Sequence, residues 1–262
     1  MDVVRVIVTG ATGRMGSEVA RALAAEPGFE LAGLVSRKAS AGRLSGWEGV
    51  PAAPTAGELL DWVQADVLVD FTVAEAAIEN ARAALRRRVA PVIGTSGLAP
   101  DQVAALAEEA RTVGVGGAVV PNFAVGAVLM MHLAKQAARF FDTAEIIELH
   151  HDGKADAPSG TALATARLLA EVRPGGFRRN VPAKEPLPGS RGAEYGGISI
   201  HAVRLPGLVA HQEVVFGGRG QTLTIRHDST SRESFIPGVL MAIRRVLETR
   251  EFYFGLEKIL DL

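Results

Sequence analysis

The sequence predicts an α/β protein: a doubly wound parallel sheet, followed by a second α+β domain with a mixed, largely antiparallel sheet. Two observations support this fold class. Over the first 122 residues, short β-rich runs alternate with longer helical patterns, and such alternation is typical of parallel sheets. After Asn122 the rhythm changes: a helix, a strand and a second helix are followed by a long irregular loop and then by three successive strand-like runs.

The first part of the chain contains five predicted strands and the helices between most of them. The strands are predicted over residues 3–8, 30–35, 66–71, 90–93 and 116–120. Amphipathic patterns predict helices over residues 14–25, 74–88 and 101–113. Because strand, helix and strand alternate, we expect the strands to lie parallel in one sheet.

The second part begins with a predicted helix at 125–140, the strand "AEIIELHH" at 144–151 and a helix at 159–171. A Pro-, Gly- and Arg-rich loop is predicted at 172–197. Strands are then predicted at 198–204, 210–216 and 221–228, with a hairpin turn at 217–220. A final amphipathic helix, 231–248, is expected to pack on the first domain. The predicted domains are 1–122, 123–230 and the C-terminal segment 231–262.

Composition excludes several classes of function. The 262 residues include 28 Lys and Arg against 29 Asp and Glu, so no basic excess indicates a nucleic-acid partner. The absence of cysteine excludes disulfides, thiolate nucleophiles and Cys-ligated zinc. The chain shows neither a signal-peptide pattern nor an apolar stretch long enough to span a bilayer. We therefore expect a cytoplasmic protein with no membrane partner.

A glycine-rich loop joins the first predicted strand to the first helix. The stretch "VIVTGATGRMGSEVA" places Gly10, Gly13 and Gly16 at this junction. Small residues let the backbone approach a pyrophosphate, and the start of a helix favours its negative charge. The context therefore predicts a Rossmann-type dinucleotide-binding domain; the alternative is a tight turn without a ligand.

The end of the second strand bears on the choice of nucleotide. Sites selective for NAD usually carry an acidic residue there, whereas this chain has Ser36, Arg37 and Lys38. A hydroxyl and two cations favour a 2′-phosphate, so we predict NADPH as cofactor, with NADH as the alternative. The other interpretation is that Arg37 and Lys38 are solvated charges in a loop and bind no phosphate. The loops "DFT" (70–72) and "GTSG" (94–97) follow other strands where such sheets bind ligands.

The stretch "HHDGKADAPSGTA" gathers polar groups after the first strand of the second domain. Ser159 is a candidate N-cap. The backbone amides in the first turn of this helix, together with the nearby Lys154, would bind a carboxylate. His150 would exchange protons near neutral pH. A structural histidine and a solvated loop are the alternatives. No metal is expected, because adjacent histidines on a strand diverge and a third ligand is not evident.

These residues also carry a resemblance. The chain resembles the dihydrodipicolinate reductase family over essentially its full length, through "GATGRMG", "DFT", "GTSG", "PNFAVG", "ELHHDGKADAPSGTA" and "HQEVVFGGRGQTLTIRHDSTSRESFIPGV". The long His-His segment is specific to that family, whereas the glycine loop is not. The resemblance implies NAD(P)H-dependent reduction of 4-hydroxy-tetrahydrodipicolinate to tetrahydrodipicolinate, in lysine and diaminopimelate biosynthesis, by a homotetramer.

The resemblance also implies roles for individual residues. His150 and Lys154 are the implied acid–base residues, and the carboxylates of the substrate are bound by His151, Lys154, Gly160 and Thr161. The implied cofactor contacts are Gly10, Ala11, Thr12, Gly13, Arg14, Met15, Ser36, Arg37, Gly94, Thr95, Ser96, Val120, Pro121, Asn122 and Phe123.

The chain departs from the family pattern at three places, none of which removes a residue with an implied chemical role. Ser36 stands where an acidic residue is common, and Ala124 stands where a serine often follows the Asn-Phe pair. Asp152 and Gly153 replace bulkier or basic residues.

The competing hypotheses are a reductase of another small dicarboxylate and a non-catalytic NADPH-sensing protein.

Overall fold

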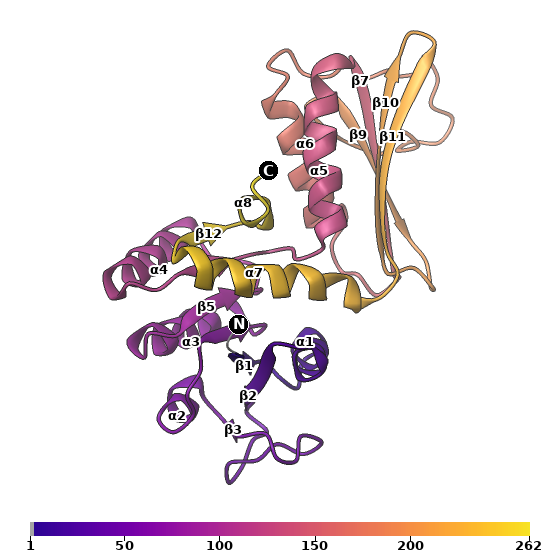
Figure 1. Cartoon of the computed structure of the whole chain (residues 1–262). Coiled ribbons are helices and arrows are strands. Elements are labelled where there is room, and N and C mark those ends of the chain that lie inside the picture. Colours follow the sequence, from indigo (N-terminus) through magenta and orange to yellow (C-terminus); the bar gives the residue numbers. More distant parts are fainter. Residues whose placement is uncertain (1–2) are drawn as a thin grey trace. The chain divides into compact units, whose positions relative to one another are not determined.

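The computed structural model describes residues 3–262, which form two compact units (Figure 1). The first unit combines the chain up to Phe123 with Phe235–Leu262, and the second spans Ala124–Ser234. One unit contains a parallel sheet covered by helices and the other a mixed sheet, so the predicted fold class is confirmed. Within residues 3–262, none of the helices combines the length and the apolar character needed to cross a bilayer.

The first unit is built on a seven-stranded sheet in the order β12-β6-β5-β4-β1-β2-β3, and every neighbouring pair is parallel. The strands are β1 Val4–Thr9, β2 Phe29–Val35, β3 Ala52–Ala53, β4 Val67–Asp70, β5 Ala90–Ile93, β6 Gly117–Val119 and β12 Phe252–Phe254. The helices are α1 Arg14–Ala25, α2 Ala56–Leu60, α3 Ala74–Arg86, α4 Pro100–Val113, α7 Ile236–Thr249 and α8 Leu256–Ile259.

The middle strands of this sheet are buried on both faces, as expected for parallel strands between helices. Ile7 and Leu68 are fully buried, and α1 buries Val19 and Leu23 on one side only. Each such side chain contributes about 1.5–3 kcal/mol when it is removed from water. The apolar runs and the amphipathic helix patterns therefore account for the layers of this unit.

The carboxyl ends of the strands lie in register at one edge of the parallel sheet. Thr9 pairs with both Val35 and Asp70, Asp70 pairs with Ile93, and Ile93 pairs with Val119. The segments that follow these residues include the glycine loop, "SRK", "DFT" and "GTSG". The strand order reverses between β1 and β4, which is where sheets of this type bind ligands.

The second unit is a five-stranded sheet in the order β11-β10-β7-β9-β8. Only the β7–β9 pair is parallel among these neighbours. The elements are α5 Val125–Ala137, η1 Ala138–Phe140, β7 Thr143–His150, α6 Gly160–Glu171, β8 Ala193–Tyr195, β9 Ile198–Arg204, β10 Ala210–Gly218, β11 Gln221–Ser229 and η2 Arg232–Phe235. The predicted hairpin turn is confirmed, since β10 and β11 are joined by two residues and Gly220 has φ +72°.

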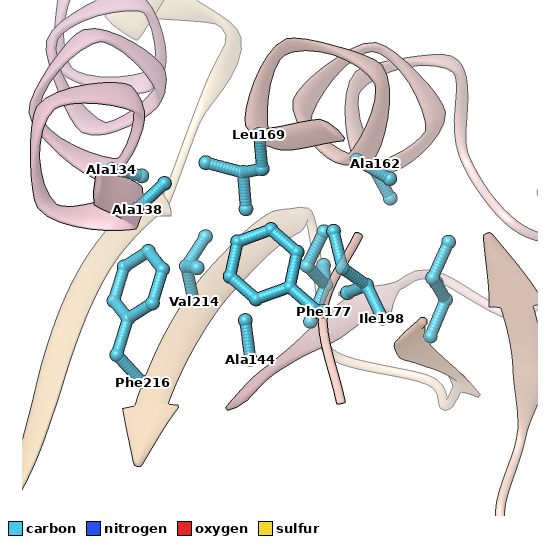
Figure 2. Close-up of a cluster of buried hydrophobic side chains, with 12 residues drawn as sticks. Ala134, Ala138, Ala144, Ala162, Leu169, Phe177, Ile198, Val214 and Phe216 are labelled. Carbon is cyan, nitrogen blue, oxygen red and sulfur yellow. The ribbon is translucent and has the colours of Figure 1, made fainter. Parts of the chain in front are cut away.

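Helices α5 and α6 pack on one face of this sheet, around Val214, Phe216 and Leu169 (Figure 2). Along β7 the even-numbered side chains Ala144, Ile146 and Glu148 are buried, whereas the odd-numbered ones are half-buried. This alternation places Glu148 on the apolar helix-covered face, which is the position that matters for the site described below.

Several short elements depart from the predictions. The predicted 172–197 loop is partly wrong, because it contains β8 and because Phe177 joins the apolar core. A strand of three exposed residues has no apolar alternation that a sequence pattern would reveal. β3, α2, β12 and α8 are also too short to predict, and helix α7 begins later than expected, after η2. The predicted strand 144–151 ends at His150, so His151 lies in the following turn and not on the opposite sheet face.

Candidate active site

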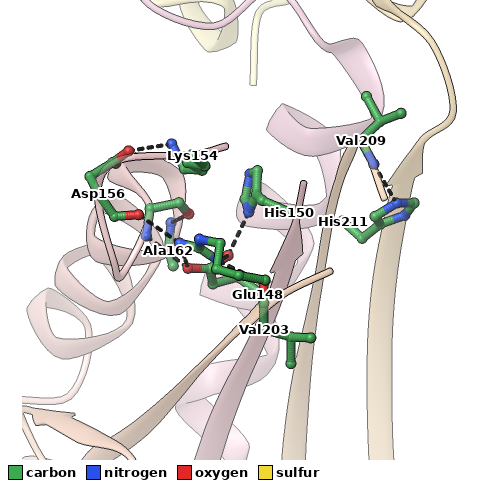
Figure 3. Close-up of polar contacts among 10 residues, drawn as sticks. Glu148, His150, Lys154, Asp156, Ala162, Val203, Val209 and His211 are labelled. Carbon is green, nitrogen blue, oxygen red and sulfur yellow. Dashed lines mark hydrogen bonds and ion pairs between the residues drawn. The ribbon is translucent and has the colours of Figure 1, made fainter. Parts of the chain in front are cut away.

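His150 and Glu148 lie close together on the helix-covered side of β7. Oε2 of Glu148 is 2.5 Å from Nδ1 of His150, and the Glu148 side chain is 0% exposed (Figure 3). An ionised carboxylate only accepts hydrogen bonds, so Nδ1 of the imidazole carries the hydrogen and donates it. The other ring nitrogen, Nε2, is therefore the one available for proton exchange.

The surroundings of this pair fix its charge state at neutral pH. Burial is the largest influence on the His150 pKa and lowers it; Glu148 opposes this effect, and the charges of Lys154 and Arg204 add to it, so the net pKa is lowered. Burial raises the Glu148 pKa, but hydrogen bonds from Arg204, His150 and the Ser159 amide together leave it lowered. At neutral pH, Glu148 is therefore an ionised carboxylate beside the uncharged imidazole of His150.

Arg204 completes this cluster from the neighbouring strand β9, where it stands in register with His150. Its Nη1 donates to Oε2 of Glu148 and its Nη2 to Oε1, each at 2.8 Å. Nη2 also donates to the backbone oxygen of Asp156 at 2.7 Å. The arginine thus connects the end of β7 with the loop that carries Lys154.

Lys154 lies in that loop and pairs with the side chain of Asp156. Its Nζ is 2.7 Å from Oδ1 of Asp156, and the side chains are 21% and 58% exposed (Figure 3). The hydrogen bond from Lys154 lowers the Asp156 pKa. An exposed carboxylate can leave the ammonium group at little cost, so a carboxylate of a ligand can take its place.

Helix α6 begins immediately after this loop. The Ser159 side chain accepts from the Ala162 amide at 3.2 Å, as an N-cap residue does, and the Ser159 amide donates to Oε1 of Glu148 at 3.0 Å. Gly160 and Thr161 open the first turn, whose amides lack partners within the helix. A Cβ atom on Gly160 would meet no heavy atom of the described chain within 4 Å, so the backbone is open to a ligand there.

The glycine loop of the first unit fits a dinucleotide. Gly10 has φ +70°, and a Cβ there would lie 2.5 Å from the Phe71 oxygen. A Cβ on Gly16 would lie 2.2 Å from the Gly10 oxygen, so the loop packs closely on itself. No side chain caps the start of α1 at Gly13, and uncapped amides at the start of a helix favour an anionic group such as a pyrophosphate.

The predicted cofactor residues outside this loop differ in accessibility. Ser36 is 7% exposed, and its Oγ lies 2.9 Å from Oγ1 of Thr12 and accepts from the Lys38 amide. Arg37 and Lys38 are exposed beside it. In the segment 120–123, the side chains of Val120 and Phe123 are buried, whereas Pro121 is exposed and Asn122 is half-buried.

The sequence analysis gave no role to Glu148 and Arg204, or to the Asp70 side chain. Asp70 is fully buried and accepts from Thr9 and Thr95 side chains, at 2.5 and 2.8 Å. Glu148 had a detectable signal, because it is a charge on the apolar side of an alternating strand. Arg204 had none, because its pairing depends on a cross-strand register. Within residues 3–262, no three His, Cys, Asp or Glu side chains are grouped to hold a metal.

The comparisons with known proteins identify the family of the chain. Residues 4–123 match the family model for the dihydrodipicolinate reductase N-terminus, and residues 126–260 match that for the C-terminus. The chain is 48% identical to 4-hydroxy-tetrahydrodipicolinate reductase from Moorella thermoacetica over 98% of both chains. It is 49% identical to the enzyme of that name from Geobacillus thermodenitrificans, over 98% of this chain and 99% of the relative.

A solved structure of a dihydrodipicolinate reductase is also similar to the chain. Dipicolinate-bound dihydrodipicolinate reductase from Paenisporosarcina sp. TG-14 is 42% identical and superposes with a TM-score of 0.90, covering 99% of this chain and 100% of the other. The resemblance predicted from the His-His segment is therefore confirmed. The protein belongs to the dihydrodipicolinate reductase family.

Proposed function

We propose that this protein reduces 4-hydroxy-tetrahydrodipicolinate to tetrahydrodipicolinate with a reduced nicotinamide nucleotide, in lysine and diaminopimelate biosynthesis. The main support is the cluster in the second unit, where hydrogen bonds of Glu148 and Arg204 join His150 to the start of α6 and, through Asp156, to Lys154. This cluster combines anion-binding groups with a titratable imidazole. Two relatives named 4-hydroxy-tetrahydrodipicolinate reductase are 48% and 49% identical to the chain.

The cationic groups would hold the substrate by its two carboxylates. Lys154 would exchange Asp156 for one carboxylate, and the amides of Gly160 and Thr161, with His151, would bind the same dicarboxylate. Fixing a reactant in this way supplies about 7–11 kcal/mol of barrier reduction in favourable model systems. His150 and Lys154 are the proposed acid–base residues; proton delivery by a positioned acid contributes about a hundredfold to ten-thousandfold.

The nucleotide supplies the hydride, and we propose NADPH, with NADH as the alternative. The glycine loop would bind the pyrophosphate, and Arg37 would face the 2′-phosphate, with Ser36 and Lys38 beside it. The segments 94–96 and 120–123 complete the proposed contacts. Exposed cations and the lack of a carboxylate at the end of β2 support the preference for NADPH.

We also propose a homotetramer that acts in the cytoplasm, where a biosynthetic reductase meets its nucleotide. Helices α5 and α6 pack on one face of the five-stranded sheet (Figure 1). We propose that the opposite face, which carries Glu145, Ile147 and Val215, contacts a second copy. A cavity of about 230 Å³ opens on this second face, on the opposite side of β7 from Glu148 and His150. Sedimentation velocity tests the oligomeric state.

An absorbance assay of NADPH oxidation tests the activity. Freshly generated 4-hydroxy-tetrahydrodipicolinate is offered with NADPH and NADH in parallel, and other small dicarboxylates are offered separately. We expect turnover with the pathway substrate only. Turnover with a different dicarboxylate alone would indicate a reductase of that other substrate. Tight NADPH binding without NADPH oxidation would indicate a non-catalytic NADPH-sensing protein.

A further inference from the structure

We infer that Glu148 and Arg204 are positioning residues for the reaction proposed above: they hold the imidazole of His150, the Lys154 loop and the start of α6 in one fixed arrangement. This inference rests on the proposed function for its kinetic consequences. Its structural consequence, the protonation pattern of one imidazole ring, does not depend on which substrate the protein reduces.

The Glu148 carboxylate accepts hydrogen bonds from three separate parts of the site. Oε2 accepts from Nδ1 of His150 and from Nη1 of Arg204, and Oε1 accepts from the Ser159 amide and from Nη2 of Arg204. Each oxygen therefore receives two donors, which is the full capacity of a carboxylate. Nothing but an ionised acid satisfies four donors at this position.

Arg204 extends the same arrangement to the loop that carries Lys154. Its Nη2 donates to the backbone oxygen of Asp156, whose side chain holds the ammonium group of Lys154. Arg204 Nε is buried and has no partner in the described part of the chain, which is an unfavourable feature. The arginine is thus placed to link Glu148 to the loop, even though one of its own donors remains unsatisfied.

Fold stability alone does not explain this pair. Glu148 follows Ala144 and Ile146 on the apolar side of β7, where an apolar side chain would pack without desolvation of a charge. Replacing a buried ion pair with apolar residues is often neutral or stabilising, so such pairs are weak evidence for stability. The partners of Glu148, by contrast, are the groups on which the proposed chemistry depends.

The Glu148→Gln substitution separates position from charge. Glutamine keeps the shape of the side chain, but its NH2 group would stand where Oε2 now accepts from Arg204 and His150. This NH2 group would donate a hydrogen bond to Nδ1 of His150. The hydrogen of the neutral imidazole would then move to Nε2, the nitrogen proposed to exchange protons. The charged groups that act on this ring are Glu148 on β7, Arg204 on β9 and Lys154 in the loop, while β10 places the uncharged Ala210 opposite His150.

The control is Glu109→Gln. Glu109 on α4 also accepts a hydrogen bond from an arginine, Arg82 on α3, at 2.9 Å, but it is partly exposed and lies outside every proposed contact with substrate, nucleotide or second copy. We expect Glu148→Gln to lower kcat about tenfold to a hundredfold, a part of the factor typical of a positioned acid. Its pH–rate limb assigned to His150 should move to lower pH, because a neighbouring negative charge is lost. The NADPH affinity of Glu148→Gln, and kcat and KM of the control Glu109→Gln, should stay within about twofold of wild type, because an exposed ion pair contributes little.

Arg204→Lys tests the connection to the loop. A lysine supplies a point charge and cannot bridge both carboxylate oxygens and the Asp156 oxygen, so KM for the dicarboxylate should rise as well as kcat fall. Wild-type kcat, KM and pH profile in both Glu148→Gln and Arg204→Lys would overturn the inference.

Nitrogen-15 chemical shifts of the His150 ring provide a readout independent of turnover. In wild type we expect the hydrogen on Nδ1, and in Glu148→Gln on Nε2, with the signal assigned by its loss in His150→Asn. If the wild-type ring carries the hydrogen on Nε2, the inference fails even when the enzyme is active. If the shifts are as expected but no dicarboxylate is reduced, the proposed function fails and the positioning role stands.

Discussion

The hydroxyl of Thr95 donates a hydrogen bond of 2.8 Å to the buried carboxylate of Asp70. Asp70 also accepts from Thr9 on β1, from Thr72 in the following loop and from Asn80 on α3. One carboxylate therefore ties the ends of three strands together at the edge where we place the nucleotide. The loop "GTSG" takes its position from this side chain.

Asp70→Ala should weaken both nucleotide binding and the fold. Its removal leaves several buried donors without an acceptor, at a cost of about 1–3 kcal/mol for each unsatisfied group, so we expect a loss of at least about 2 kcal/mol. We also expect the NADPH Kd to rise about tenfold, because Thr95 and Thr72 lose their anchor. Urea unfolding and fluorescence titration measure the two effects. Asp101→Asn, on the exposed start of α4, is the control, and wild-type affinity in Asp70→Ala would contradict the assignment.

Acidification should destabilise the fold partly through His150. Its pKa is lowered in the folded state, so between that value and its usual value of about 6.5 the unfolded chain binds the extra proton. Stability is therefore lost as pH falls from neutral through this window. We expect the thermal midpoint of wild type to fall more than that of His150→Asn as the pH is lowered from neutral through and below about 6.5. Equal falls in the two proteins would argue against a buried, neutral His150.

Lys154→Ala should lose most of the activity, chiefly through turnover. The variant lacks the cation that we propose to orient the dicarboxylate, and orientation contributes several kcal/mol to such reactions. Steady-state kinetics with the pathway substrate measure the effect. A variant with near-normal kcat and KM would remove Lys154 from the proposed machinery.

His150→Gln should lower kcat and leave NADPH binding intact, because the residue lies in the second unit and the proposed nucleotide contacts lie in the first. Parallel measurement of turnover and of the NADPH Kd separates the two roles. Loss of nucleotide binding would indicate that the residue serves the fold and not the reaction.

The predicted NADPH preference depends on two exposed cations. Arg37→Ala combined with Lys38→Ala should raise KM for NADPH about tenfold or more and leave KM for NADH nearly unchanged, since only NADPH carries the 2′-phosphate. An equal effect on both nucleotides, or on neither, would show that these side chains are solvated loop charges.

The parts that the sequence predicts are those with local signals. Buried runs such as Val67–Asp70, and the helix start at Ser159 with its N-cap, depend on nearby residues and were correctly placed. The Glu148–Arg204 pair lies 56 positions apart and requires the parallel register of β7 and β9, which no short pattern contains. Phe177 was assigned to a loop for the same reason, because its core contacts come from distant strands.

The measurement that tests the central claim most directly is a crystal structure of the protein with NADPH and dipicolinate bound together. We predict that one carboxylate of dipicolinate contacts Nζ of Lys154 and the amides of Gly160 and Thr161, with the ring against the nicotinamide and the His150 imidazole facing it. A ring bound elsewhere, or His150 and Lys154 directed away from it, would contradict the account.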